Sequence, residues 1–173
     1  MVKTWVAFAC SCAFLVHVAL NSNTTKPDYH TAWVTESTIA LVEHFEGKRH
    51  RAYRDSEGNW TIGVGHLIKR KDHHLLRVEL TEEEVMGILH RDLQTCSETL
   101  QSVLNVGLKR PQIDALHSLC HNIGPDNFAR SDVVKYMNRG EMEKAGNAFM
   151  NWSKPDVLKK RRQAEKALFL TGL

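Results

Sequence analysis

The segment EGKRHRAYRDSEGNWTIGVGHL, Glu46–Leu67, joins a helical pattern to a strand-like pattern within a few residues. Apolar residues recur at helical spacing from Leu41 to Phe45, immediately before it. Gly47 is then a natural helix stop, because glycine readily adopts the left-handed conformation that ends many helices. We therefore predict that Glu46 lies on the last turn of a helix, where the backbone fixes its position.

A hairpin is predicted directly after this helix. The cluster Asp55–Asn59, DSEGN, is rich in turn-forming residues. The run Trp60–Val64, WTIGV, contains the β-branched and aromatic residues that are typical of a returning strand. Asp55 and Thr61 are therefore expected on a hairpin beside the helix that ends at Glu46.

Glu46, Asp55 and Thr61 carry the functional groups that cleavage of a glycosidic bond requires. The reaction needs an acid to protonate the leaving oxygen and a carboxylate to assist on the other side of the bond. Partial desolvation beside Phe45 would favour the protonated form of Glu46, whereas Asp55 in a polar turn would stay ionised. The Thr61 hydroxyl would hold a water molecule. Each residue alone also fits a structural role, as a solvated helix-end charge, a turn former or a strand former.

The spacing of nine residues in this region resembles that of the phage-type lysozymes, also called endolysins. The matching positions are Glu46, Gly47, Tyr53, Asp55, Gly58, Thr61, Gly63, Gly65 and His66. Weaker matches follow at Ala115–Phe128, ALHSLCHNIGPDNF, and at Arg161–Gly172, RRQAEKALFLTG. The resemblance extends over roughly residues 35–172, which is nearly all of the chain after its first thirty residues.

The resemblance implies an endolysin that hydrolyses the β-1,4 bond between N-acetylmuramic acid and N-acetylglucosamine in bacterial peptidoglycan and thereby causes cell lysis. It implies Glu46 as the general acid, with Asp55 and Thr61 acting on the water or on the developing cation. It implies substrate contacts at Leu67, His121 and Asn122. His121 stands where the family usually carries a large apolar residue. The resemblance implies no cofactor and no metal, and the paired His73 and His74 have no third ligand at useful spacing.

The expected fold is mostly helical α+β, with a small β-hairpin lobe and a helical lobe joined by a long helix, and with a cleft between the lobes. Thr81 and Glu84 form a capping-box pattern at the start of that long helix. Its buried stripe is predicted to be Val85, Ile88, Leu89, Leu93 and Cys96. His66 is expected to pair with an acid on this helix, for which Asp92 is the candidate.

Four further helices are predicted after the long one. The first has Pro111 in its first turn and stops at Gly124–Pro125. The others cover residues 130–138, 141–152 and 157–170, and Pro155 breaks the chain before the last of them. Lys159–Arg162, KKRR, is expected to be a solvated helix face, with contact to an anionic wall or lipid as the alternative.

The chain has 173 residues, enough for one domain with a sizeable core, and a formal charge of +3. This mild excess is too small to indicate nucleic acid and suits a polyanionic wall or a membrane surface. We expect a monomer. Two other function classes stay open: a non-catalytic wall-binding module, and a cationic protein that perturbs membranes without chemistry.

Residues 1–30 differ in composition from the catalytic domain expected over residues 31–173. Lys3 precedes the apolar run Thr4–Leu20, and a polar segment, 21–30, follows. This layout is typical of export to the periplasm or cell envelope. The run has 17 residues and would span roughly 25 Å as a helix, less than the roughly 30 Å hydrocarbon core. A cleaved signal peptide and a releasable membrane anchor both fit; we favour the anchor, and a buried helix of the domain is the third interpretation.

Cysteine occurs twice in the leader, at Cys10 and Cys12, and twice in the predicted helices, at Cys96 and Cys120. Export would place all four in an oxidising compartment. Cys96 and Cys120 both lie on apolar stripes, where free cysteine is often simply buried. We therefore expect two buried thiols, with a Cys96–Cys120 disulfide as the alternative.

Overall fold

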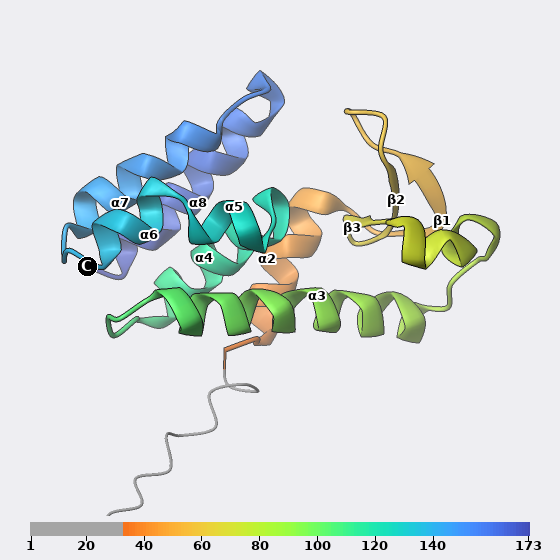
Figure 1. Ribbon diagram of the computed structural model, residues 1–173, viewed down its shortest axis with the longest axis horizontal. Coiled ribbons are helices and arrows are strands. Elements are labelled where there is room, and N and C mark those ends of the chain that lie inside the picture. The colour runs from red at the N-terminus through yellow and green to blue at the C-terminus, as the bar shows by residue number, and fades with distance from the viewer. Residues whose placement is uncertain (1–32) are drawn as a thin grey trace, which may run out of the picture.

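Helix α3 (Glu82–Val103) is the element to which both lobes attach. It begins where the capping box was predicted: the Glu84 backbone N–H donates to Thr81 Oγ1 at 3.2 Å, and the Thr81 N–H donates to Glu84 Oε2 at 2.8 Å. The computed structural model describes residues 33–173, so the leader predicted over residues 1–30 lies outside the described residues. Figure 1 shows α3 along the lower edge of the molecule, beneath both lobes.

The apolar face of α3 divides between two hydrophobic cores, one for each lobe. Its first half and the hairpin lobe share a core made of Val42, Ile62, Val64, Ile68, Leu75, Leu80, Val85, Ile88, Leu89 and Leu93. Its second half contributes Cys96 and Leu100 to the core of the helical lobe. The expected two-lobed α+β fold and the predicted buried stripe are thus confirmed.

The hairpin lobe contains α2 (Glu36–Glu46) and a three-stranded antiparallel sheet in the order β1-β2-β3. Its strands are β1 (Arg49–Arg54), β2 (Trp60–Gly63) and β3 (His66–Leu67). The 3-10 helix η1 (Arg70–Arg77) follows and buries Leu75. His66 Nδ1 lies 2.8 Å from Asp92 Oδ2, so the pairing predicted between the sheet and α3 is confirmed.

The helical lobe begins with α4 (Arg110–Ile123), which has Pro111 in its first turn and ends at Gly124, as predicted. The Gly124–Pro125 stop also starts another helix, α5 (Pro125–Ala129). The remaining elements are α6 (Asp132–Met137), α7 (Met142–Ala148), η2 (Phe149–Trp152), η3 (Asp156–Leu158) and α8 (Lys159–Thr171). The predicted helix over 141–152 is therefore divided into α7 and η2.

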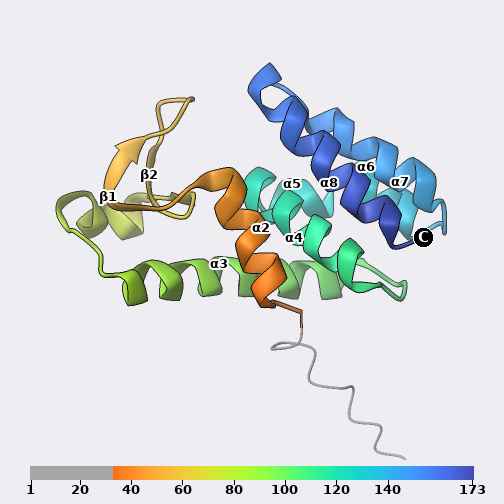
Figure 2. The ribbon, with the colours of Figure 1, turned by 180° about the vertical axis from the view of Figure 1, so that it is seen from behind.

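A buried carboxylate fixes α2 against the helical lobe. Asp114 of α4 accepts hydrogen bonds from the hydroxyls of Thr38, at 2.6 Å, and of Ser37, at 2.8 Å. These contacts hold the N-terminal half of α2, and its C-terminal half continues into the sheet (Figure 2). Within residues 33–173, no helix combines the length and apolar character needed to cross a bilayer.

Cys96 of α3 and Cys120 of α4 form a disulfide, with their Cα atoms 5.9 Å apart, so the expectation of two buried thiols was wrong. Each apolar stripe was assigned correctly, but the sequence does not show that the two stripes face each other at this level. The neighbouring His117 of α4 is also fully buried; its Nδ1 donates to the Ile113 carbonyl and its Nε2 accepts from Ser97 of α3, both at 2.8 Å. Burial lowers the pKa of His117 to about 4, which keeps the imidazole neutral.

The first prediction concerns this cross-link. The disulfide closes a loop with a sequence separation of 24, so removing it should lower the free energy of unfolding by about 3 kcal/mol. Denaturant unfolding of the Cys96→Ala/Cys120→Ala variant measures this difference. Reductant should destabilise the unaltered protein and leave the double variant unchanged. Free thiols at both positions in the non-reduced protein, detected by mass spectrometry, would contradict the pairing.

Candidate active site

Glu46 occupies the last residue of α2, as the sequence predicted. Gly47 ends the helix with φ of +69°, and its N–H donates to the Glu43 carbonyl at 2.9 Å. The Glu46 side chain is 17% exposed, so it is largely removed from water. The second glycine of GVGH lies directly against its carboxyl group: a Cβ placed on Gly65 would be 2.8 Å from Glu46 Oε2.

Arg161, at the start of α8, binds this carboxyl group from the helical lobe. Its Nη1 donates to Glu46 Oε1 at 2.5 Å, and the guanidinium lies 5.1 Å from the centre of the Phe45 ring. The same guanidinium donates through Nη2 to the Ser118 carbonyl at 3.0 Å. Glu46 Oε1 is therefore occupied, whereas Oε2 has no hydrogen-bond partner among residues 33–173 and is not fully buried.

A second ion pair lies behind Arg161. Glu165 Oε1 accepts from Arg161 Nε, and its Oε2 lies 2.9 Å from Arg162 Nη1. Arg162 and Glu165 are fully buried, and burial lowers the pKa of Arg162 to about 10, which still leaves it charged at neutral pH. Two guanidinium groups and two carboxylates thus balance in charge. The prediction that Lys159–Arg162 is a solvated face holds for the two lysines and is wrong for Arg161 and Arg162.

Tyr53, Thr61 and Leu67 share one face of the sheet. Thr61 of β2 pairs with Tyr53 of β1 and with Leu67 of β3, and paired residues in antiparallel strands point to the same side. Burial, and next the negative charge of Glu46, raise the pKa of Tyr53 above its ordinary value. The charge of Asp55 acts on Tyr53 in the same direction. Tyr53 thus lies opposite Thr61 in the sheet and is affected by the charges of Glu46 and Asp55.

Asp55 closes the turn of the hairpin. Its Oδ1 accepts the backbone N–H groups of Glu57, at 2.9 Å, and of Asn59, at 2.8 Å, and its Oδ2 accepts from the Asn59 amide at 3.3 Å. The turn-forming role considered for this residue is therefore real. Thr61 is buried, and its hydroxyl donates to the Asn59 carbonyl across 3.4 Å, a long contact that leaves the hydroxyl weakly held.

The three predicted substrate-binding residues have different surroundings. Leu67 is 44% exposed, on the same sheet face as Thr61. His121, near the end of α4, donates from Nε2 to the Val64 carbonyl at 3.0 Å and so links the helical lobe to the GVGH segment. Asn122 accepts from Arg162 Nη2 at 2.6 Å through its side-chain oxygen. Both polar residues are half-buried and already tied to the protein.

The sequence analysis did not identify Arg161, which binds the candidate acid, or Glu165, which binds Arg161. They are four residues apart on α8, which puts them on one helix face. That spacing, in a segment resembling the endolysin tail, was the available signal, but a run of four basic residues reads first as a solvated surface. Among residues 33–173, no group of three or more His, Cys, Asp or Glu side chains is arranged to hold a metal ion.

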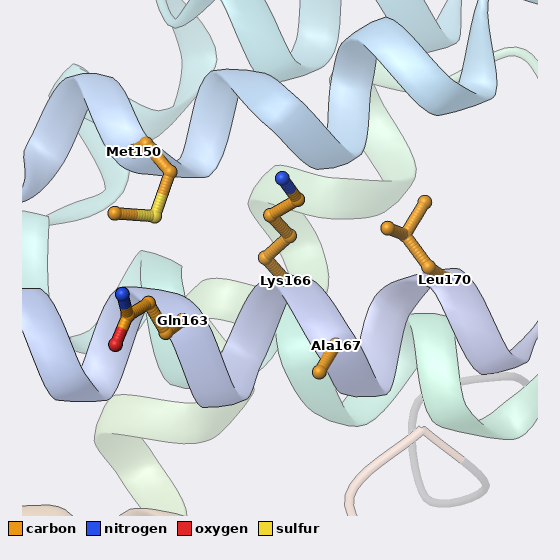
Figure 3. Close-up of a pocket in the computed structure, with 5 residues that line it drawn as sticks. All are labelled: Met150, Gln163, Lys166, Ala167 and Leu170. Atoms are coloured by element: carbon orange, nitrogen blue, oxygen red, sulfur yellow. The ribbon is translucent and has the colours of Figure 1, made fainter.

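An apolar pocket lies away from these residues, between α8 and the segment around η2. It is lined by Met150, Gln163, Lys166, Ala167 and Leu170 (Figure 3). At 100° per residue, Gln163, Lys166 and Leu170 project from the side of α8 opposite to Arg161 and Glu165. This pocket is therefore separate from the charged site around Glu46.

Two phage proteins are similar to this chain in sequence. The endolysin of Salmonella phage P22 is 38% identical over 143 residues, covering 80% of this chain and 98% of its own. The SAR-endolysin of Enterobacteria phage P21 is 28% identical, covering 73% of this chain and 78% of its own.

Solved structures of phage lysozymes and of a muramidase domain superpose on this chain. A P22 lysozyme mutant superposes with a TM-score of 0.67 at 38% identity, covering 79% of this chain and 97% of that one. The muramidase domain of SpmX from Asticaccaulis excentricus gives the same TM-score and coverage at 31% identity. The family model described as phage lysozyme matches residues 43–165. That range includes the Glu46–Leu67 segment and both arginines of α8, and the chain belongs to the phage lysozyme family.

Proposed function

We propose that this peptidoglycan-hydrolysing endolysin cleaves the β-1,4 bond between N-acetylmuramic acid and N-acetylglucosamine with Glu46, Asp55 and Thr61. The observation that carries the proposal is the hydrogen bonding of the two oxygens of the Glu46 carboxyl group. Its Oε1 is held by Arg161, so Oε2 is the oxygen left to carry a proton toward the glycosidic oxygen. Gly65 lies directly against that oxygen and adds no side chain of its own there.

The reaction then follows general acid catalysis. Glu46 Oε2 protonates the leaving oxygen as the bond to the anomeric carbon breaks, and positive charge develops on the sugar. Asp55 supplies a negative charge toward that cation or toward the attacking water. Thr61 hydrogen-bonds the water, because its hydroxyl is only weakly engaged with Asn59. Arg161 keeps the Glu46 side chain in one orientation throughout.

The polar substrate contacts are proposed from the groups left free at Asn122 and His121. A guanidinium only donates hydrogen bonds, so the Asn122 oxygen faces Arg162 and its NH₂ group remains to donate to a substrate acceptor such as an acetamido carbonyl. His121 donates from Nε2 to Val64, which leaves Nδ1 of the neutral ring as an acceptor. Leu67 would contact an apolar part of the sugar.

Glu46→Gln tests the acid. The amide keeps the shape but has no proton to give, so we expect turnover on purified peptidoglycan to fall about 10²–10⁴-fold. Glu36→Gln, on the exposed first turn of the same helix, is the matched control and should be normal. Near-normal turnover by folded Glu46→Gln protein would show that another group donates the proton and would contradict the proposed role of Glu46.

Thr61→Val tests the water-binding role. Valine matches threonine in shape, and the hydroxyl makes only a 3.4 Å contact, so we expect stability to change little. Turnover should fall at least tenfold while wall binding is retained, and Thr61→Ser should restore most of it. Turnover within about twofold of the original in Thr61→Val would remove Thr61 from the catalytic group.

We further propose that residues 1–30 export the enzyme and hold it at the inner membrane as a monomer before release. The layout of Lys3 and Thr4–Leu20 supports this, and so does the similarity to SAR-endolysins. The full-length chain should first fractionate with membranes and later become soluble at the same mass. Replacing Thr4, Ser11 and His17 with leucine should delay that release, because a more apolar segment gains more from the bilayer. Recovery of only a shortened form beginning near Asn21 would show a cleaved signal peptide instead.

A further inference from the structure

The sheet and η1 of the hairpin lobe carry an excess of basic residues. Residues 47–79 contain eight Lys or Arg and four Asp or Glu, a net charge of +4, whereas the whole chain has a net charge of +3. Residues 107–173 carry a similar excess, with twelve Lys or Arg and seven Asp or Glu. Net charge alone therefore does not single out a surface, and the pairing of each basic side chain decides which of them can attract an anionic partner.

Four of these basic residues form an unpaired group on and beside η1. Lys69, Arg70, Lys71 and Arg77 are exposed, and their side chains make no hydrogen bond or ion pair within residues 33–173. We call these four residues the basic surface. Arg51, on the neighbouring strand, is different because it is paired with Glu79. The acidic residue within the group, Asp72, has one carboxylate oxygen buried in the protein and no salt bridge to these residues.

Two exposed apolar side chains belong to the same lobe as the basic surface. Trp60 is 38% exposed with the Arg54 guanidinium 4.3 Å from its ring centre, and Val78 beside Arg77 is 40% exposed. Tryptophan next to Lys and Arg is typical of the boundary between lipid headgroups and acyl chains.

The basic surface lies on the side of the sheet away from the candidate site. Trp60 pairs with Arg54, and side chains alternate along β2, so Trp60 points to the same side as Ile62. Ile62 packs in the core cluster that includes Leu75 of η1, whereas Thr61 and Leu67 point to the opposite side. A glycan strand held against Thr61 and Leu67 would therefore not extend over η1.

We propose that Lys69, Arg70, Lys71 and Arg77 bind the anionic phospholipid headgroups of a bilayer, with Trp60 and Val78 at the level of the headgroups. The surface combines unpaired cations with exposed apolar groups, which suits a lipid interface better than the carboxylates of peptidoglycan stem peptides. Bound in this way, the enzyme keeps the Thr61 face of the sheet free for substrate. The proposal depends neither on the catalytic role of Glu46 nor on the leader.

Vesicle binding by the full-length chain tests the proposal. The Arg70→Gln/Lys71→Gln/Arg77→Gln variant should bind vesicles of phosphatidylglycerol and phosphatidylethanolamine on the order of 100-fold more weakly than the unaltered protein. The unaltered protein should lose that advantage as salt rises, since salt screens charges at the surface. The leader is the same in both proteins, so its contribution to binding is common to both. Vesicles of phosphatidylcholine, which lack net charge, should bind the two proteins equally.

The matched control removes three charges from the helical lobe. Arg130, Lys159 and Lys160 are exposed, and the structure gives their side chains no ion pair. The Arg130→Gln/Lys159→Gln/Lys160→Gln variant should keep the vesicle affinity within about threefold, as its removed charges lie away from the surface that meets the lipid. An equal loss in both variants would show that only net charge matters and would overturn the proposal.

Binding to purified peptidoglycan separates the lipid from the wall. Glu46→Gln prevents digestion of the wall during the assay. In that background, the Arg70→Gln/Lys71→Gln/Arg77→Gln variant should bind peptidoglycan as tightly as the protein that carries Glu46→Gln alone. Weaker wall binding with unchanged vesicle binding would identify peptidoglycan as the partner and overturn the lipid assignment. With Glu46 intact, the Arg70→Gln/Lys71→Gln/Arg77→Gln variant should also digest purified peptidoglycan at the normal rate. Failure of the lipid proposal is therefore distinguishable from failure of the proposed catalytic role of Glu46.

Discussion

The ion pair between Glu46 and Arg161 sets the requirement that the rest of the structure must meet. A charge removed from water without a partner costs several kcal/mol, and here Glu46, Arg161, Arg162 and Glu165 are all largely or fully buried. Each is stable only because the others are in place. The C-terminal end of α2 and the N-terminal end of α8 must therefore meet, although they are 115 residues apart.

Three other features make that meeting possible. Asp114 holds the other end of α2 against α4, so the helix reaches the site at a fixed position. Ser118 of α4 accepts from Arg161 and donates to Glu165 at 2.6 Å, which links the pairs to the core of the helical lobe. Gly65 allows the sheet to approach the carboxyl group, because its φ of +71° and the 2.8 Å approach of Glu46 both exclude a larger residue.

The sequence predicted what depends on local chemistry and missed what depends on how helices face each other. Thr81 with Glu84, the glycine stop after Glu46 and the turn at Asp55 are signals within a few residues, and all three lie where expected. Both cysteines were placed on buried stripes, but the facing of α3 and α4 that joins them is a tertiary property. Arg161 was missed for the same reason, since its partner Glu46 lies on a helix 115 residues earlier in the sequence.

The structure also shows how much of the net charge of the chain is available at its surface. A formal charge of +3 counts a buried arginine and an exposed one equally. The structure shows that Arg161 and Arg162 neutralise Glu46 and Glu165 inside the protein, so half of the KKRR run offers no charge to an outside partner. Within residues 33–173, exposed basic side chains without an ion pair lie at Lys159 and Lys160 and, as a larger group, on and beside η1. Burial thus divides the basic residues into those that orient the acid and those available to a surface.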